Sequence, residues 1–313
     1  ETPSPTDKGP ASAYYASANY GKRVWMADLK NAGDAARVRD ALAETDIAIT
    51  SFRPGADRRL GMDPEGLLTA HPKLILARIT GYGPEDNRAA YDLVLQAETG
   101  WMSMTGFPDG PPAKLPVALV DVLAAHQLKQ AILLALWQRA RDGKGRLVEV
   151  SLHDASISAL ANQASNWLMA GHCPGRMGSL HPNIAPYGEC FPCSDGQLLV
   201  LAVGAEAQFK TLCQVLGLER LPEQPDFATN AQRVQHREAL QAAMAPAFTQ
   251  QPRDAWLSQL HAAGVPAGAV RSLDAVFDHA AAQAMVLEDA TGKRVRQVAF
   301  RPSRGHAWSH PKG

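Results

Sequence analysis

Short apolar segments alternate with helical patterns along the first half of the chain, and this alternation limits the fold more than any other feature. The apolar segments of strand length are residues 47–50, 73–79, 117–120 and 147–152. The stretches between them carry apolar residues at helical spacing, and one contains the helix-start pair Asp63-Pro64. Strands that are apolar on both faces and separated by helices are typical of a covered parallel sheet. We therefore predict an α/β fold with a parallel-sheet large domain.

The second half has a different character. A stretch rich in Pro and Gly covers residues 171–187, and an apolar strand follows at 197–203. Helical patterns then follow at 205–216, 231–248 and 253–263. We predict a large α/β domain over residues 1–175 and a smaller α+β domain over 186–290. Residues 291–313 are predicted to return toward the large domain and to end in a tail.

The charge balance excludes several classes of binding protein. The 313 residues carry 31 Lys plus Arg and 31 Asp plus Glu, so the net charge is zero. A neutral chain has no basic surface for nucleic acid or for an anionic membrane. We also expect no apolar run that approaches the length of a membrane span. The prediction is a protein that binds neither nucleic acid nor a membrane.

Cysteine usage indicates a reducing, cytoplasmic location. Only four Cys occur in the chain, which is too few for a disulfide scaffold. Cys190 and Cys193 have the spacing of a zinc or redox pair, but no second pair accompanies them. Structural thiols are the favoured interpretation, and we predict no metal site.

Asp121 is the carboxylate most strongly marked by its position. It stands between the predicted strand 117–120 and a long predicted helix, 121–141. Ligands bind at the carboxyl ends of strands in open α/β sheets, and a helix N-terminus stabilises an anion. We expect a buried, ionised Asp121 that can act as a nucleophile. Capping of the helix is the more common use of Asp at such a position, so the residues alone favour a cap, and the two uses do not exclude each other.

Two other segments carry candidate binding groups. Arg53, Arg58 and Arg59 follow the first predicted strand and could bind phosphates of an acidic ligand, or form a solvated turn. Residues 174–178 could be a mobile lid, and their composition fits a linker equally well.

An ordered set of motifs resembles the class III CoA-transferase family, which includes formyl-CoA transferase, carnitine CoA-transferase and acyl-CoA racemases. The motifs extend over roughly residues 15–300. They include Tyr20-Gly-Lys-Arg23, Ser51-Phe-Arg-Pro-Gly55, Ile79-Thr-Gly-Tyr-Gly83, Tyr91-Asp-Leu-Val-Leu-Gln-Ala97, Ala118-Leu-Val-Asp121, His181-Pro-Asn-Ile-Ala-Pro-Tyr187 and Gly264-Val-Pro-Ala-Gly268. The resemblance implies a Rossmann-like large domain and an interlocked homodimer.

The resemblance also implies a role for each matching position. Asp121 falls on the family's catalytic aspartate. The positions that contact CoA are matched by Lys22, Phe52 and Arg59, those at the acyl end by Tyr91 and Asp92, and those near the loop that covers the active site by Gly175 and Gly178.

The implied reaction moves CoA from an acyl-CoA thioester to a small carboxylic acid through aspartyl-anhydride and aspartyl-CoA intermediates. It needs no metal and no tightly bound cofactor, because acyl-CoA is the substrate. An acyl-CoA racemase or epimerase is the alternative within the family. The family's racemases have His where this chain has Tyr91, and Tyr is a poor base near neutral pH.

The chain departs from the family pattern at both ends. The resemblance implies that a strand–helix–strand unit of the family precedes Glu1 and is absent from this sequence, and that the C-terminal segment is short. An inactive remnant that binds acyl-CoA is therefore a third interpretation.

Overall fold

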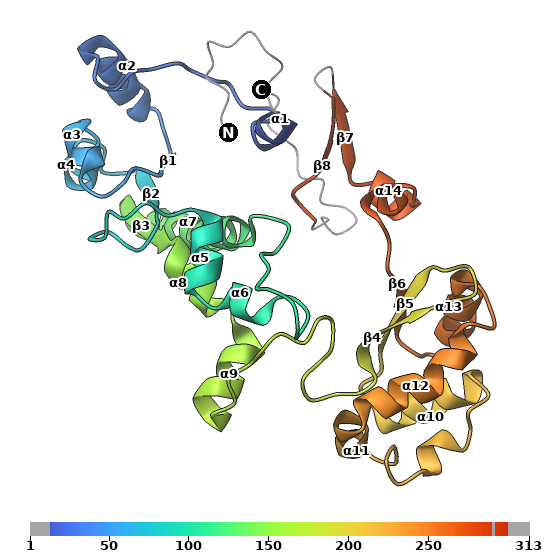
Figure 1. Ribbon diagram of the computed structural model, residues 1–313. Coiled ribbons are helices and arrows are strands. Elements are labelled where there is room, and N and C mark those ends of the chain that lie inside the picture. Colours follow the sequence, from blue (N-terminus) through green and yellow to red (C-terminus); the bar gives the residue numbers. More distant parts are fainter. Residues whose placement is uncertain (1–12, 290–291, 300–313) are drawn as a thin grey trace. The chain divides into compact units, whose positions relative to one another are not determined.

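The structure is a computed structural model, and it describes residues 13–289 and 292–299 (Figure 1). Contacts divide the chain into two compact units. One unit contains residues 27–268, and the other contains the segments before residue 27 and after residue 268. The domain boundaries expected from the sequence stay predictions.

A parallel sheet forms the centre of the first part of the larger unit. Its strands are β1 (Ile47–Thr50), β2 (Ile75–Thr80) and β3 (Arg146–Ser151), in the order β1-β2-β3. Both neighbouring pairs are parallel, with Ile75 aligned to Ile47 on one side and to Arg146 on the other. The predicted α/β fold with a parallel sheet is confirmed. The strand predicted at 117–120 is wrong, because a helix begins there.

Helices surround this sheet in chain order. They are α2 (Ala32–Leu42), α3 (Ala56–Arg59), α4 (Pro64–Ala70), α5 (Asp92–Glu98), α6 (Trp101–Met104), α7 (Leu119–Asp142), α8 (Leu152–Ser158) and α9 (Ala161–Ala170). The predicted start of α4 is confirmed, since Asp63 Oδ2 accepts a hydrogen bond from Gly66 N at 3.1 Å and Pro64 takes the first position. Leu95, Val120 and Leu152 pack in one buried cluster that joins α5, α7 and α8.

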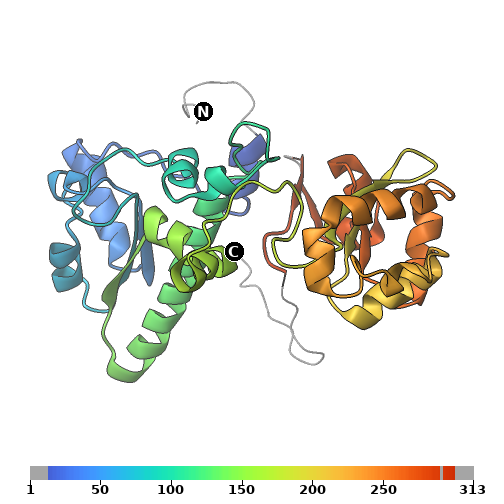
Figure 2. The same ribbon diagram turned by 60° about the horizontal axis from the view of Figure 1, so that its bottom comes forward.

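Helix α7 carries apolar residues on both of its faces (green in Figure 2). Its buried residues are Val120, Ala124, Leu128 and Ala135, and its exposed apolar residues include Val122, Leu133, Leu134 and Trp137. Among the described helices it alone is long and apolar enough to cross a membrane, so the expectation that no segment approaches this length is wrong. Such a helix is weak evidence of a membrane span, because core helices of soluble proteins meet the same criteria.

Helix α7 is also fastened at its C-terminal end. Arg139 Nη1 donates hydrogen bonds to Lys73 O at 2.9 Å and to Asp46 O at 3.2 Å. Its Nη2 donates to Asp46 Oδ1 at 2.9 Å. Lys73 and Asp46 precede β2 and β1, so this arginine ties the helix to the amino ends of two strands.

The second part of the larger unit consists of a small sheet and several helices. The strands are β4 (Tyr187–Pro192), β5 (Leu198–Ala202) and β6 (Ala267–Ala269), in the order β4-β5-β6, with β4 antiparallel to β5. The helices are α10 (Glu206–Val215), α11 (Asn230–Gln235), α12 (Arg237–Phe248) and α13 (Arg253–Ala262), and a 3₁₀ turn covers Leu221–Glu223. Phe248 stacks on Phe191 with ring centroids 4.4 Å apart, and it meets Trp256 edge-on at 5.7 Å.

The smaller unit contains α1 (Ala13–Ala18), α14 (Leu273–Phe277), α15 (Ala280–Gln283), β7 (Val286–Asp289) and β8 (Gly292–Val295). Strands β7 and β8 form an antiparallel hairpin. Arg294 on β8 lies over the Tyr20 ring, 4.5 Å from its centroid, and donates to Ala16 O at 3.2 Å. These contacts hold the first described helix against the hairpin.

A close approach of two backbones at the start of β3 requires glycine. A Cβ on Gly145 would lie 2.0 Å from Leu74 O, whereas a Cβ on Gly143 would meet nothing within 4 Å. We expect Gly145→Ala to lower the free energy of unfolding by about 3 kcal/mol through overpacking. Gly143→Ala should cost about 1 kcal/mol, because Gly143 has a φ of 71° and only the left-handed backbone penalty applies. Urea unfolding of both variants checks this, and equal losses contradict it.

Candidate active site

A cleft of about 230 Å³ lies beyond the carboxyl ends of the three parallel strands. Its lining residues are Ser51, Phe52, Arg53, Pro54, Ile79, Thr80, Gly81, Asp86, Arg88, Ala90, Tyr91 and Leu152. Residues 51–54 follow β1, the lining residues between 79 and 91 end or follow β2, and Leu152 follows β3. Open α/β sheets bind ligands at this edge, so the cleft is the candidate ligand site.

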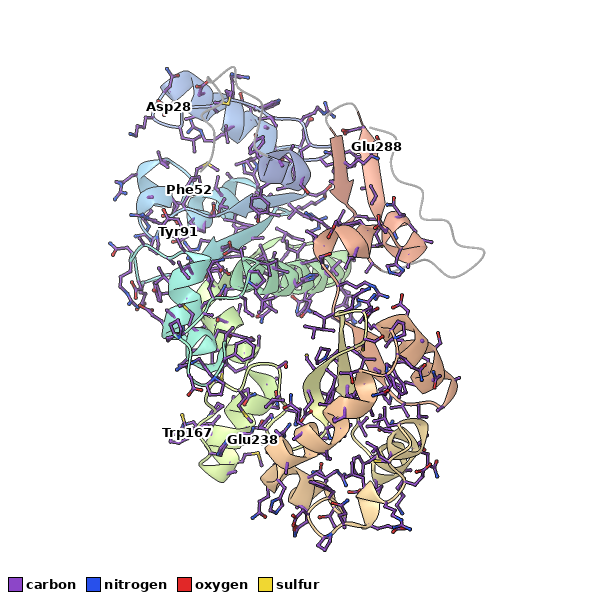
Figure 3. All side chains as sticks on the ribbon, turned by 45° about the vertical axis from the view of Figure 1, so that its right-hand side comes forward. Asp28, Phe52, Tyr91, Trp167, Glu238 and Glu288 are labelled. Carbon is purple, nitrogen blue, oxygen red and sulfur yellow. The ribbon has the colours of Figure 1, made fainter. Side chains whose placement is uncertain are left out.

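Three of the residues selected from the sequence line this cleft, namely Phe52, Arg53 and Tyr91. Phe52, from the loop after β1, and Tyr91, directly before α5, both line it. Figure 3 labels both on the same side of the α/β part. The Tyr91 side chain is 70% exposed, and Phe52 is half-buried. Two aromatic rings at the edge of a cleft are suited to contact the flat or apolar parts of a ligand.

The cationic groups of the cleft are Arg53 and Arg88. The Arg88 guanidinium lies over the Tyr82 ring, 3.8 Å from its centroid, and its Nε donates to Asp86 Oδ2 at 2.9 Å. The Asp86 carboxylate raises the pKa of Arg88, so this side chain carries a fixed positive charge. Arg88 could not be recognised from the sequence, because one arginine in an irregular segment has no pattern.

The other predicted CoA contacts lie outside the residues that line the cleft. Arg59 is exposed at the end of α3, beside Arg58, whose Nε donates to Asp63 Oδ1 at 3.0 Å. Lys22 belongs to the other compact unit, and its Nζ donates to Asn19 Oδ1 at 3.5 Å. The roles of Lys22 and Arg59 stay predictions.

Asp121 lies in the first turn of α7, which begins at Leu119 after the capping position of Ala118. Asp121 therefore does not cap the helix. The capping group comes from α5 instead, because Asp92 Oδ1 accepts a hydrogen bond from Val120 N at 2.7 Å. Within the described residues, the Asp121 carboxylate has no hydrogen-bond partner. Its oxygens are free for chemistry.

The segment before α7 fails to form a strand because side chains satisfy its backbone. Gln96 Oε1 accepts from Leu115 N at 2.8 Å, and Gln96 Nε2 faces Val117 O at 3.4 Å. Asp92 Oδ1 likewise accepts from Val120 N. Side chains thus make the backbone hydrogen bonds that a neighbouring strand would otherwise make. Gln96 was not among the residues selected from the sequence, although it lies four residues after Asp92 in α5, a spacing that places two helical side chains on one face.

The surroundings of Asp121 disfavour its charged form. Partial desolvation of the carboxyl group, and then the negative charge of Asp92, raise the pKa of Asp121 above its usual value. The side chain is nevertheless exposed in this chain, so the expected burial of Asp121 is wrong.

Replacing Asp121 should stabilise the fold. A carboxyl group with a folded-state pKa above its unfolded value costs stability at pH above that pKa, and the cost disappears as the pH falls through it. We expect Asp121→Asn to unfold at higher urea concentration than the parent at about pH 8, with the gain vanishing toward about pH 4.

Asp142→Asn, at the other end of α7, is the control, because its expected change in stability near pH 8 has the opposite sign. Hydrogen bonds from Lys144 N and Arg146 lower the pKa of Asp142, so its removal should cost stability at about pH 8 and nothing at low pH. Urea unfolding of both variants across the pH range separates the two signs. An Asp121→Asn variant that is less stable than the parent at about pH 8 contradicts the expectation.

The predicted covering segment has its contacts with the loop after α6. Gly178 N donates to Gly106 O at 2.8 Å, and a Cβ on Gly178 would lie 2.9 Å from the Phe107 ring. Gly178 also has a φ of 62°, so both its left-handed backbone and the nearby Phe107 ring require glycine there. Gly175 and Gly178 both line a second cleft of about 110 Å³. Their covering of the active site stays a prediction.

The four cysteines are free thiols that differ in burial. Cys193 and Cys213 are buried. Burial raises the pKa of the Cys193 thiol, and it raises the pKa of Cys213 to about 12. In the described part of the chain, no group of three His, Cys, Asp or Glu side chains is arranged to hold a metal ion.

Comparison with known proteins gives a consistent result. The model of CoA-transferase family III matches residues 2–311. An acyl-CoA transferase of Fusarium pseudograminearum is 37% identical over 285 residues, which cover 90% of this chain and 62% of that protein. A succinate–glutarate CoA-transferase of Agrobacterium fabrum is 37% identical over 270 residues, which cover 85% of this chain and 67% of that protein. The chain thus spans about two thirds of the length of the curated relatives it matches.

The similarity extends to solved structures. The crystal structure of a CAIB/BAIF family protein from Brucella suis matches with a TM-score of 0.82 and 38% sequence identity. The match covers 94% of this chain and 78% of the Brucella chain.

Proposed function

This chain belongs to CoA-transferase family III, and from that premise we propose that it moves CoA from an acyl-CoA thioester to a carboxylic acid. The observation that carries the proposal is the state of Asp121. Asp92 takes over the capping of α7, and the Asp121 carboxylate is left without a hydrogen-bond partner among the described residues. A carboxylate with both oxygens free at a helix start can act as a nucleophile.

Four covalent steps complete the exchange. The Asp121 carboxylate attacks the thioester carbonyl, giving a mixed anhydride and CoA thiolate. The thiolate then attacks the aspartyl carbonyl, which releases the donor carboxylate and leaves an aspartyl-CoA thioester. The acceptor carboxylate attacks this thioester and releases CoA thiolate again. Finally, the thiolate attacks the acceptor carbonyl of the new anhydride, giving the product thioester and restoring Asp121.

The cleft at the strand ends supplies two of the proposed binding groups, Phe52 and Tyr91, and the others lie outside its lining. Phe52 is proposed to contact the adenine ring of CoA, and Lys22 and Arg59 its phosphates. Tyr91 and Asp92 are proposed to lie beside the acyl group, with Gly175 and Gly178 in the covering segment. Exclusion of water by that segment would protect the anhydride and the thioester from hydrolysis. We propose no metal and no tightly bound cofactor.

An exchange assay tests the proposal. The protein is incubated with succinyl-CoA and glutarate, a pair suggested by the Agrobacterium relative, and then with other short donors and acceptors. Mass spectrometry of the acyl-CoA products should find CoA on the acceptor. Deuterium entering the α-carbon of an acyl-CoA without any acceptor would support a racemase instead. Absence of both reactions over a broad set of acids would overturn the proposal.

An acyl-CoA binder without exchange activity is the second candidate, because Asp121 is not among the described residues that line the cleft with Phe52 and Tyr91. Calorimetric titration with CoA, on the same sample as the exchange assay, separates the two. Binding without exchange identifies a binder.

We also propose an interlocked homodimer with a Rossmann-like large domain, located in the cytoplasm. Apolar side chains on α7 and α9 support the dimer, because a lone chain exposes Trp137, Trp167, Leu168 and Met169 (Trp167 is labelled in Figure 3). The four free cysteines fit a reducing compartment. Sedimentation velocity at several concentrations distinguishes dimer from monomer.

A further inference from the structure

We propose that Asp92 and Gln96 form a positioning pair that fixes the start of α7 and, through Val120, the backbone that carries Asp121. The fixing of the helix start is a statement about the fold. Its effect on turnover rests on the proposed function.

The pair uses its polar atoms inside the protein. Asp92 Oδ1 accepts from Val120 N at 2.7 Å, and Asp92 Oδ2 accepts from Gln96 Nε2 at 2.6 Å. Gln96 Oε1 accepts from Leu115 N at 2.8 Å. The Gln96 side chain is 0% exposed, so its bonds form away from water, where an unpaired partner is costly.

Helix α7 needs this pair because its own sequence supplies no cap. Ala118 stands at the capping position and has no side-chain acceptor. The first-turn N–H groups must find partners elsewhere, and α5 provides one for Val120. Val120 is 1% exposed and directly precedes Asp121, so holding its N–H in place fixes the direction of the next side chain.

The same pair places a negative charge beside the proposed nucleophile. The elements packed on α7 carry Asp92 and Glu98 on α5, His153 and Asp154 on α8, Arg78 on β2, and Arg146 and Glu149 on β3. Of these, only Asp92 affects the pKa of Asp121, and it raises it. A variant that keeps the hydrogen bond to Val120 N and removes the charge of Asp92 therefore separates two effects. One is the effect of the hydrogen bond on the position of α7, and the other is the effect of the charge on Asp121.

An exchange of the two functional groups provides that separation. In Asp92→Asn, the new amide NH₂ faces the Gln96 NH₂, so two donors oppose each other. In Gln96→Glu, two carboxylates oppose each other. In the double variant, the amide oxygen at position 92 still accepts from Val120 N, and its NH₂ donates to the carboxylate at position 96. That carboxylate still accepts from Leu115 N, so three hydrogen bonds of the pair are restored and the charge has moved by one side chain. The longer bond from Gln96 Nε2 to Val117 O, at 3.4 Å, is lost in both variants that carry Gln96→Glu.

We expect each single variant to lower kcat of CoA exchange by about tenfold to a hundredfold, because a displaced nucleophile loses its alignment with the thioester. KM for the CoA thioester should change by less than about threefold, since the cleft around Phe52 is untouched. The double variant should recover kcat to within about threefold of the parent. Asp40→Asn, which removes an exposed carboxylate on α2, is the control and should leave both constants unchanged.

A second readout is independent of turnover. Carbon-13 NMR titration of the Asp121 carboxyl group should find a lower pKa in Asp92→Asn than in the parent and in Asp40→Asn. Urea unfolding should find the double variant more stable than either single variant. If a single variant does not fold, recovery of a folded, active double variant itself supports the pair.

Two results overturn the inference. One is a double variant that is no more stable and no more active than the worse single variant. The other is an Asp92→Asn variant with parental kcat and an unchanged Asp121 titration. Failure of the proposed function is distinguishable, because the parent would then show no CoA exchange, while the Asp121 titration and the unfolding cycle still report on the pair.

Discussion

Asp121→Ala is expected to abolish CoA exchange, lowering kcat by about four orders of magnitude or more, as removal of a covalent nucleophile does in other enzymes. Asp121 combines a position in the first turn of a helix with oxygens free of hydrogen bonds to the described residues and a neighbouring carboxylate, Asp92, that raises its pKa. The measurement is the initial rate of product thioester formation by mass spectrometry, with succinyl-CoA and glutarate.

Asp121→Asn is the matched variant for this experiment. It keeps the size of the side chain and is expected to be more stable than the parent near neutral pH, so loss of activity cannot be assigned to unfolding. Digestion after incubation with donor alone should find CoA joined to the peptide that contains Asp121 in the parent and not in the variant. Turnover above a few per cent in either variant would refute Asp121 as the nucleophile.

The largest stability effect is expected in the second part of the larger unit. Arg237 Nη1 donates to Glu189 Oε1 at 2.6 Å, and the Glu189 side chain is 1% exposed. Arg237 Nη2 also donates to His181 O at 2.6 Å and to Ile184 O at 2.9 Å. Arg237→Leu leaves a buried carboxylate and two carbonyls without their donor. It should lower the free energy of unfolding by about 3–5 kcal/mol.

The double variant Arg237→Leu with Glu189→Gln tests the cause. Removing the charge at position 189 removes the largest part of the penalty, so the double variant should be more stable than Arg237→Leu. Glu189→Gln alone keeps an acceptor for Arg237, so it should lower the free energy of unfolding by less than Arg237→Leu or the double variant. Urea unfolding of the four proteins completes the cycle. A double variant that loses as much as the sum of the single variants would argue against a buried ion pair.

The sheet was predictable from sequence because its signal is local. Strands β1, β2 and β3 are short apolar runs, and each is followed or preceded by a recognisable turn or helix start. The run at 117–120 has the same local pattern and is the start of α7. Its partners, Asp92 and Gln96, lie about twenty to thirty positions earlier in the chain. A pattern within the run contains no information about such distant side chains.

Those residues of the candidate site that belong to a recognisable motif could be predicted from the sequence. Phe52 and Tyr91 come from separate motifs and line one cleft. Arg53 and Arg58 share one sequence pattern, and only the fold distinguishes Arg53 in the cleft from Arg58, which is paired with Asp63. The exposure of Asp121 depends on which atoms surround the first turn of α7 in three dimensions, and no spacing rule supplies that.

The fastening of α7 at both ends has a consequence for how catalysis can proceed. Asp92 holds the first turn, and Arg139 joins the last turns to the amino ends of β1 and β2. A helix tied in this way can neither slide along its axis nor rotate about it without breaking both sets of bonds. The backbone that carries Asp121, the proposed nucleophile, is therefore held in place. Under the proposed mechanism, the thioester itself must move to bring the acyl group to this carboxylate and to take it away.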